Sequence, residues 1–288
     1  MNQPLWMPKR RIEVAFRRAL LNVAKGIVAH AEKASDPAAI SVALERLTQA
    51  PGFNHLSEAI AMKMVTGLFD DTGRTWREAA RNNSRGRDIY QALQKELLGG
   101  RGGCARELVK ENATLIKTLP KNIADDVTAY AAREAMKGRR ASDIADEIRR
   151  MFPERTRARA ELIARTQVSM TQTNLVRTRA EGLGLNWYIW RACGGKQGDG
   201  RTRNSHRRMS GVLVRWNDPP APEDLFPLHR TDGKPYNNKL GNYHAGCCPN
   251  CRCYSEPVVD INVLDWPMRV HRNGTIGRVT RKQFERMM

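Results

Sequence analysis

The sequence predicts an α+β fold, in which a mainly helical N-terminal region is followed by a small α+β C-terminal domain with a candidate zinc staple. Apolar residues recur at helical spacing through most of the chain before Leu185, which is typical of amphipathic helices. Beyond Leu185, short runs of aromatic and β-branched residues replace that pattern, as expected for strands. Four of the six cysteines lie within residues 247–253, close enough to meet at one ion.

The helical region begins with a clear stripe. Between residues 10 and 33, apolar side chains recur three and four positions apart, at Ile12, Phe16, Leu20, Val23 and Ile27, and such a stripe predicts an amphipathic helix. The sequence Ser-Asp-Pro at 35–37 predicts an N-cap with proline at the first position of a second helix. Similar patterns predict helices at 56–69, 74–98, 104–119 and 122–138.

Two stretches interrupt this region. The segment 82–86 has low helix propensity, and the four glycines within 99–103 predict a loop or hinge. A long helix is then expected after Pro153, ending near Gly182 and Gly184.

The smaller C-terminal part reads as strands and turns. Residues 186–193 and 211–216 predict strands, on which Trp187 and Ile189 face one way and Tyr188 and Trp190 the other. Aromatic side chains can stack bases, but at least one of these faces is expected to be core. Residues 219–242 predict a long loop, Asn273-Gly274 a β-hairpin, and 280–288 a short terminal helix. We therefore divide the chain into a helical region 1–152, a domain 153–260 and a C-terminal hairpin and tail 261–288.

The charge limits the partners. With 49 Lys and Arg against 30 Asp and Glu, the formal net charge is +19, which favours phosphate, an acidic protein face or an anionic membrane. The first eleven residues lack the apolar core of a signal peptide, and no later apolar run approaches the length of a membrane helix. We expect a soluble, cytosolic origin with no membrane partner.

The cysteine cluster "CCPNCRC" has metal-ligand spacing. Cys248 and Cys251 form a CxxC pair, and Cys253 projects to the same side as Cys251 in an extended segment. A closed tetrahedral zinc site needs a fourth ligand, for which His206 and His244 are the best-placed candidates, with Cys247 and Cys193 less suitable.

The same cysteines also fit roles without a metal. They could be small buried apolar residues, whereas disulfides are disfavoured in a reducing cytosol. A catalytic thiolate with His206 or His244 as its base is a third hypothesis, weakened because no acidic residue is obviously placed to orient the base. The sequence also lacks the phosphate-loop, HExxH and GxSxG motifs, which lowers the case for an ATPase, a zinc protease or a serine hydrolase.

A group of arginines surrounds His206. Arg201, Arg203, Arg207 and Arg208 alternate with polar residues, and such a cluster could contact nucleic-acid phosphates. A solvated charged face is the common alternative for such a run.

Several segments in order resemble one family. "IARTQVSMTQTNLVRTRAEGLG", an aromatic strand, "DGRTRNSHRRMSGVLV" and "PNCRCYSEPVV" resemble the phage Mu F-like head morphogenesis proteins, which are minor capsid proteins of tailed phages and prophages. The resemblance covers about residues 158–259. Its most specific residues are Asp199, Arg201, Thr202, Arg203, His206 and Gly211, followed by Asn250, Cys251, Arg252 and Cys253.

The resemblance implies a ligand set and a role. Matched position by position, His206, Cys248, Cys251 and Cys253 would hold one structural zinc. The chain departs from the family pattern at Arg203, where some relatives have a cysteine, and at Gln167, where an acidic residue is common.

The implied role is non-enzymatic. It is that of a minor head protein at the portal vertex, which aids head morphogenesis and DNA packaging within the virion. Its expected partners are the portal protein, a scaffold or major capsid protein, and packaged DNA. The alternatives are a zinc-stabilised nucleic-acid-binding module that holds packaged DNA or, less favoured, a cysteine-dependent or nuclease-like enzyme.

Overall fold

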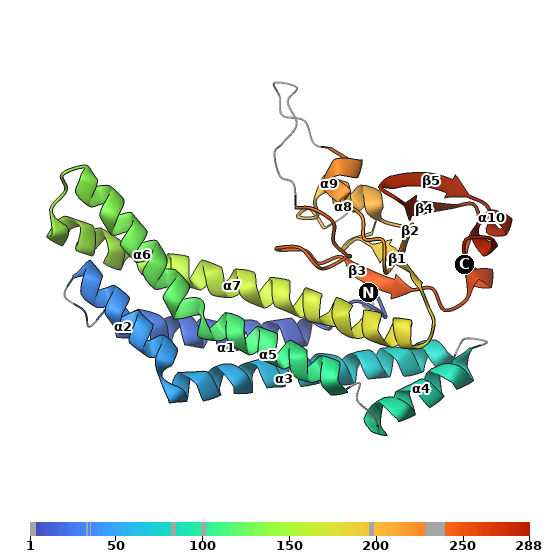
Figure 1. Cartoon of the computed structure of the whole chain (residues 1–288), viewed down its shortest axis with the longest axis horizontal. Coiled ribbons are helices and arrows are strands. Elements are labelled where there is room, and N and C mark those ends of the chain that lie inside the picture. The colour runs from blue at the N-terminus through green and yellow to red at the C-terminus, as the bar shows by residue number, and fades with distance from the viewer. Residues whose placement is uncertain are drawn as a thin grey trace. The chain divides into compact units, whose positions relative to one another are not determined.

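The computed structural model confirms the α+β class and describes residues 4–32, 34, 36–81, 85–98, 102–195, 199–227 and 240–288. The predicted features at 82–84, 99–101 and 228–239 lie outside the described residues. Figure 1 shows helices from blue to yellow, followed by the strands in yellow-orange to red. The helices are α1 (Arg10–Ala31), α2 (Pro37–Gln49), α3 (Pro51–Arg81), α4 (Gly86–Leu98), α5 (Gly102–Lys117), α6 (Leu119–Met136), α7 (Ala141–Gly182), α8 (Asn204–Met209), α9 (Pro222–Leu225) and α10 (Arg281–Glu285), with a 3-10 turn η1 (Ile261–Val263).

The chain divides into two compact units, each assembled from separate stretches of sequence. Unit 1 combines Met1–Lys9, Leu68–Cys104 and Val168–Met288, and unit 2 combines Arg10–Gly67 and Ala105–Gln167. The division of the sequence after residues 152 and 260 stays a prediction. No helix among the described residues is long and apolar enough to cross a membrane.

The first helices form as their sequence predicts. On α1 the predicted stripe is buried at Phe16, Leu20, Val23 and Ile27. On α2 the side chain of Asp36 accepts a hydrogen bond from the backbone N–H of Ala39 at 2.9 Å, and Pro37 occupies the first turn. This is the predicted N-cap, and it satisfies one of the unpaired N–H groups of the helix start.

Two helices are longer than predicted. α3 runs through the expected gap between residues 69 and 74, because Leu68 and Trp76 on either side of the gap are fully buried. α7 begins at Ala141 and contains Pro153 rather than starting after it. Proline inside a helix removes one hydrogen bond, but Ile144, Ile148 and Phe152 are buried on the preceding turns, and their packing keeps those turns helical.

Unit 2 contains an apolar groove between α6 and the first half of α7, with a volume of about 460 Å³. The lining side chains come from one stripe of each helix, including Val127 and Tyr130 on α6 and Met151 and Leu162 on α7. Arg155 also lines it, with its guanidinium 6.0 Å from the centroid of the Tyr130 ring. The groove is therefore an apolar surface edged by charged side chains, among them Arg155 and the ion pair of Arg159 with Asp126.

Unit 1 is built around a five-stranded mixed sheet in the order β3-β1-β2-β4-β5. Its strands are β1 (Trp187–Arg191), β2 (Val212–Arg215), β3 (Tyr254–Pro257), β4 (Met268–Arg272) and β5 (Thr275–Val279). Neighbours are antiparallel except β2 and β4, which are parallel. Two of these strands, β1 and β2, confirm predicted runs, and β4 and β5 form the predicted hairpin. Its turn residues Asn273 and Gly274 have φ of 46° and 75°, as a tight type I′ connection requires.

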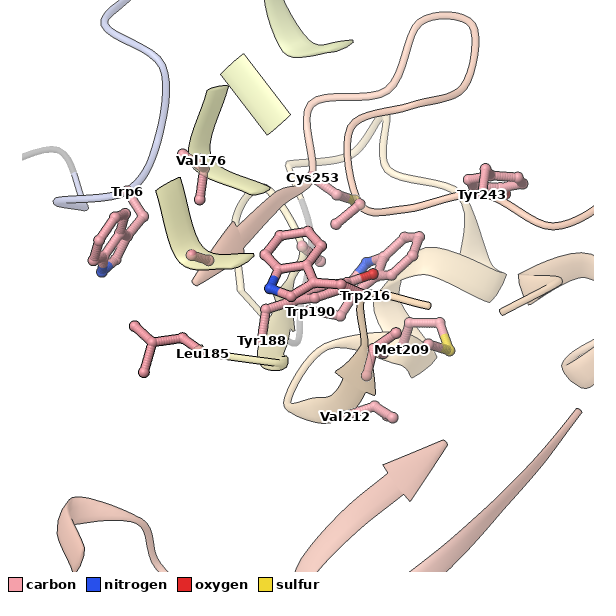
Figure 2. Packing of buried hydrophobic residues seen from close by; sticks show 14 of the residues in the cluster. Trp6, Val176, Leu185, Tyr188, Trp190, Met209, Val212, Trp216, Tyr243 and Cys253 are labelled. Atoms are coloured by element: carbon pink, nitrogen blue, oxygen red, sulfur yellow. The ribbon is translucent and has the colours of Figure 1, made fainter. Parts of the chain in front are cut away.

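Both faces of β1 are buried. Tyr188 and Trp190 pack in a cluster with Met209, Val212 and Cys253, and Figure 2 shows these side chains gathered together. Trp187 and Ile189 pack on the other face with Leu213, Val270 and Phe284. Since none of the strand's three aromatic side chains is more than 5% exposed, base stacking by this strand is ruled out.

Candidate metal centre

His206 is placed by the short helix α8. Ser205, His206 and Met209 are the buried residues of this helix, so the imidazole points into the cluster that contains Trp190. The helix is followed by Gly211, whose φ of 83° lets the chain reverse into β2 without a Cβ clash. His206 itself is 1% exposed.

A tight turn positions the first two cysteines. The backbone N–H of Cys251 donates to the oxygen of Cys248 at 3.1 Å, and Asn250 has a φ of 59°. Proline at the second position and a positive φ at the third are the signature of a type II turn, so "CPNC" encodes the turn that brings Cys248 and Cys251 together. Cys253 then precedes β3 in extended chain, on the same side as Cys251.

The structure brings the sulfurs of all three predicted cysteines to the ring of His206. The sulfurs of Cys251 and Cys253 each lie 3.5 Å from Nδ1 of His206, and the sulfur of Cys248 lies 3.9 Å from Nε2. One ligand atom from each of His206, Cys248 and Cys251 lies within 4.8 Å of the others. None of the four side chains is more than 3% exposed.

These donors fit a structural zinc site. With usual bond lengths, the nitrogen and sulfur ligands of a tetrahedral zinc lie about 3.6 Å apart, close to the 3.5 Å from Nδ1 to Cys251 and Cys253. Three sulfurs and one imidazole are also a common closed zinc set. The fit is looser at Cys248, which lies nearer the other ring nitrogen and accepts a hydrogen bond from Nη1 of Arg203 at 3.1 Å.

A tyrosine and a glutamate orient the imidazole. The hydroxyl of Tyr243 donates to the carboxylate of Glu223 (2.7 and 2.8 Å) and lies 2.8 Å from Nε2 of His206. Because that hydroxyl has a single hydrogen, it accepts from Nε2–H. The neutral imidazole therefore carries its hydrogen on Nε2 and presents the Nδ1 lone pair to Cys251 and Cys253. Outer hydrogen-bond partners fix the tautomer of metal-binding histidines in the same way.

When no metal is bound, the surroundings of His206 and Cys248 favour the protonated form of both side chains. Burial alone lowers the pKa of His206, but hydrogen bonds to Cys248, Cys251 and Glu223 outweigh it and raise that pKa to about 11. The hydrogen bond to Cys251, together with burial, raises the pKa of the Cys248 thiol. A metal would displace these protons, because zinc binds thiolate and neutral imidazole.

Residues 123–256 match the family model described as phage Mu protein F like protein. Over these residues the chain is similar to the phage Mu protein F-like proteins. The match extends the predicted resemblance towards the N-terminus, from α6 to β3. No curated protein and no solved structure matches the chain. The family indicates a phage head morphogenesis protein, a structural role in the virion that is consistent with the prediction of a non-enzyme.

The other predicted ligands of this Mu F-like region lie in different surroundings. Nδ1 of His244 lies 3.2 Å from the hydroxyl of Tyr188, and its Nε2 lies 3.4 Å from Arg177. Burial raises the pKa of Cys247 to about 12 and that of Cys193 to about 11. The geometry therefore selects His206 over His244, a choice that spacing in the sequence left open.

The thiols of the Mu F-like region do not resemble nucleophiles. A reactive cysteine has a lowered pKa and is reached by solvent, whereas Cys248 is 2% exposed and its pKa is raised. Glu223, which the sequence did not single out, does orient His206 through Tyr243. That chain directs the imidazole at three buried sulfurs, which suits a structural centre better than a general base.

Two of the four predicted phosphate-binding arginines have contacts of their own within the protein, and the group stays a prediction. Arg203 points to the cysteine turn, where its Nη2 donates to the oxygen of Pro249 at 2.9 Å. Arg208 lies over the ring of Phe226, 4.3 Å from its centroid, and Arg201 and Arg207 are exposed. Glu223 and Tyr243 are the functional candidates that sequence reasoning missed, and no spacing rule links either of them to His206.

Proposed function

We propose that this protein is a minor head protein at the portal vertex of a phage head, where it aids head assembly and DNA packaging. The match of residues 123–256 to the phage Mu protein F-like family carries the proposal. In this role it contacts the portal protein together with scaffold or major capsid protein, and it is needed in few copies. No turnover is required of it.

The groove between α6 and α7 supports a contact with another head protein. Helix-in-groove recognition uses an apolar stripe of the partner helix against such a surface. Leu162 lines the groove and remains 37% exposed. Arg155 at the groove favours an acidic side chain beside the apolar stripe of the partner.

An assembly assay tests this role. In a system that produces complete procapsids, we expect the chain to co-purify with the portal protein and to enter the procapsid. Leu162→Glu should abolish both, because it places a charge in the groove. Leu115→Glu is the matched control, since Leu115 is also a 37% exposed helix residue of unit 2 and does not line the groove. Failure of the unaltered chain to enter otherwise complete procapsids would refute the proposed function.

We also propose that His206, Cys248, Cys251 and Cys253 hold a structural zinc. When bound, the ion would supply four bonds that link α8 to the cysteine turn and to the start of β3. The chain's own residues prepare the site: Tyr243 and Glu223 fix the imidazole, and the type II turn fixes two sulfurs. This clasp would explain the presence of three of the four cysteines within residues 247–253.

Metal analysis tests the clasp. Protein purified without added metal should contain about one equivalent of zinc, and Cys251→Ser should lose it and unfold at a lower temperature. Cys104→Ser is the control, because Cys104 lies near Thr178 (3.3 Å) and not in the cluster. Less than about half an equivalent in the unaltered protein, with reactive thiols in the native state, would contradict the zinc site.

A further inference from the structure

Two arginines face each other across the C-terminal hairpin. In the antiparallel pair of β4 and β5, Arg269 lies directly opposite Arg278, on the same side of the sheet. Like charges in this position destabilise a strand pair. The next pairs along the hairpin carry no such conflict, since Val270 faces Gly277 and His271 faces Ile276. The arginine pair is thus an unfavourable feature for folding, which suggests another use.

The guanidinium of Arg269 is held in place rather than free to move away. Its Nη1 donates to the backbone oxygen of Arg208 at 2.8 Å, and its Nη2 donates to the oxygen of Ser210 at 2.5 Å. Burial, and then the charges of Arg208 and Arg278, lower the pKa of Arg269. The guanidinium of Arg269 therefore lies within electrostatic range of two other arginines, Arg208 of α8 and Arg278 of β5.

Arg208 is also fixed, by its contact with the ring of Phe226 (4.3 Å to the centroid). In the part of the chain that the structure describes, no carboxylate forms an ion pair with Arg208, Arg269 or Arg278. Other arginines of unit 1 are paired, such as Arg191 with Glu256 and Arg281 with Glu285. Arg208 and Arg269 are therefore held in place, and the three arginines have no counter-charge among the described residues.

We propose that Arg208, Arg269 and Arg278 form a binding site for the phosphates of DNA. The planar guanidinium group matches phosphate oxygens in two-point hydrogen bonds, and an anion between Arg269 and Arg278 would remove their repulsion. The formal net charge of +19 adds long-range attraction to a polyanion. Contacts of this kind carry no base information, as suits a protein that meets any packaged sequence. The site shares Arg208 with the predicted group of Arg201, Arg203, Arg207 and Arg208, in which Arg203 is engaged by Cys248.

A salt titration tests the site with the purified full-length chain and a fluorescent DNA duplex, read by anisotropy. This inference deepens the proposed role in packaging, but the binding assay does not depend on head assembly, so either can fail alone. We expect Arg208→Gln and Arg278→Gln each to weaken binding at low salt. The slope of log affinity against log salt is negative, and each variant should reduce its magnitude by about 0.9. The loss of affinity between about 50 and 200 mM salt then becomes roughly threefold smaller.

Arg281→Gln is the matched control, because it removes the same charge from nearby α10, where Arg281 is paired with Glu285. The proposal is overturned if Arg208→Gln and Arg278→Gln change the slope no more than Arg281→Gln does, or if the unaltered chain does not bind the duplex at low salt. Polyglutamate serves as a second probe. If the chain binds polyglutamate more tightly than DNA, and the same substitutions weaken that binding, the ligand of the site is an acidic protein instead.

Thermal melting without DNA provides an independent measurement. Arg278→Gln should melt at the same temperature as the unaltered chain or at a higher one, because it removes a like-charge pair from the hairpin. A clearly lower melting temperature would show that Arg278 supports the fold and would overturn the proposal that its charge is kept for a ligand.

Discussion

At the scale of single residues, the two histidines near the cysteines have opposite surroundings. His206 is bordered by sulfurs and by the Glu223–Tyr243 pair, which raise its pKa. His244 is bordered by Tyr188 and Arg177, and burial followed by the charge of Arg177 lowers its pKa to about 4. Both residues fit the spacing for a fourth ligand, so the sequence could not choose between them. The choice depends on which side chains surround each ring.

The lowered pKa of His244 predicts acid sensitivity. A histidine whose pKa is lower in the folded state than its unfolded value of 6.5 stabilises the fold fully above that value. The contribution is lost as the pH falls from about 6.5 to about 4, when the unfolded state takes up the proton first. The shift corresponds to about 3 kcal/mol at most. We therefore expect His244→Gln to lessen the loss of unfolding free energy over this pH range.

Urea unfolding at several pH values measures this effect. The experiment is done with a chelator present, so that release of a metal from the cysteine cluster does not contribute. The difference in unfolding free energy between the unaltered chain and His244→Gln should shrink steadily as the pH falls. A difference that stays constant between about pH 7 and pH 4 would show that His244 is not the acid-sensitive group.

At the scale of elements, the loop that carries the cysteines approaches α7 so closely that only glycine fits at position 246. A Cβ there would lie 2.9 Å from the backbone oxygen of Cys253 and 2.9 Å from Oγ1 of Thr173, and its φ is 88°. Gly246→Ala should therefore destabilise the fold by about 2–4 kcal/mol, combining backbone strain with overpacking. Gly241→Ala is the matched control, since Gly241 has a φ of 74° and open space around it.

Chemical denaturation of the two glycine variants separates these causes. Gly241→Ala should cost about 1 kcal/mol from backbone strain alone. If Gly246→Ala costs no more than this, the loop does not press against α7. A larger cost for Gly246→Ala, with reduced metal content, would link the close approach to the geometry of the cysteine cluster.

The elements show where local sequence is sufficient. The N-cap at Asp36, the hairpin turn at Asn273-Gly274 and the stripe of α1 follow from local chemistry and were predictable. The start of α7 was not, because burial of Ile144 and Ile148 outweighs the local effect of Pro153. The convergence of Cys248, Cys251 and Cys253 was predictable from their spacing. The partners Glu223 and Tyr243 were not, because long-range packing alone brings them to His206.

At the scale of the whole molecule, the matched region is not a separate fold. Residues 123–256 include β1, β2 and β3, but β2 pairs on its other side with β4, which lies at Met268–Arg272. The cluster around Trp190 also includes Trp6, Trp76 and Ile89 from far upstream. Trp6 and Trp76 meet edge to face with ring centroids 4.9 Å apart. The core that supports the cysteine centre is therefore completed by segments on both sides of the matched region.

This arrangement predicts the behaviour of fragments. A fragment of residues 123–256 should show helix by far-UV circular dichroism but no cooperative near-UV transition, because a sheet that lacks β4 and an open core cannot offset the entropy of ordering the chain. A fragment of residues 68–288 keeps all the strands and Trp76, so it should regain a cooperative transition at a lower temperature than the full chain. A sharp near-UV melt of the 123–256 fragment, equal to that of the full chain, would show that the matched region folds alone.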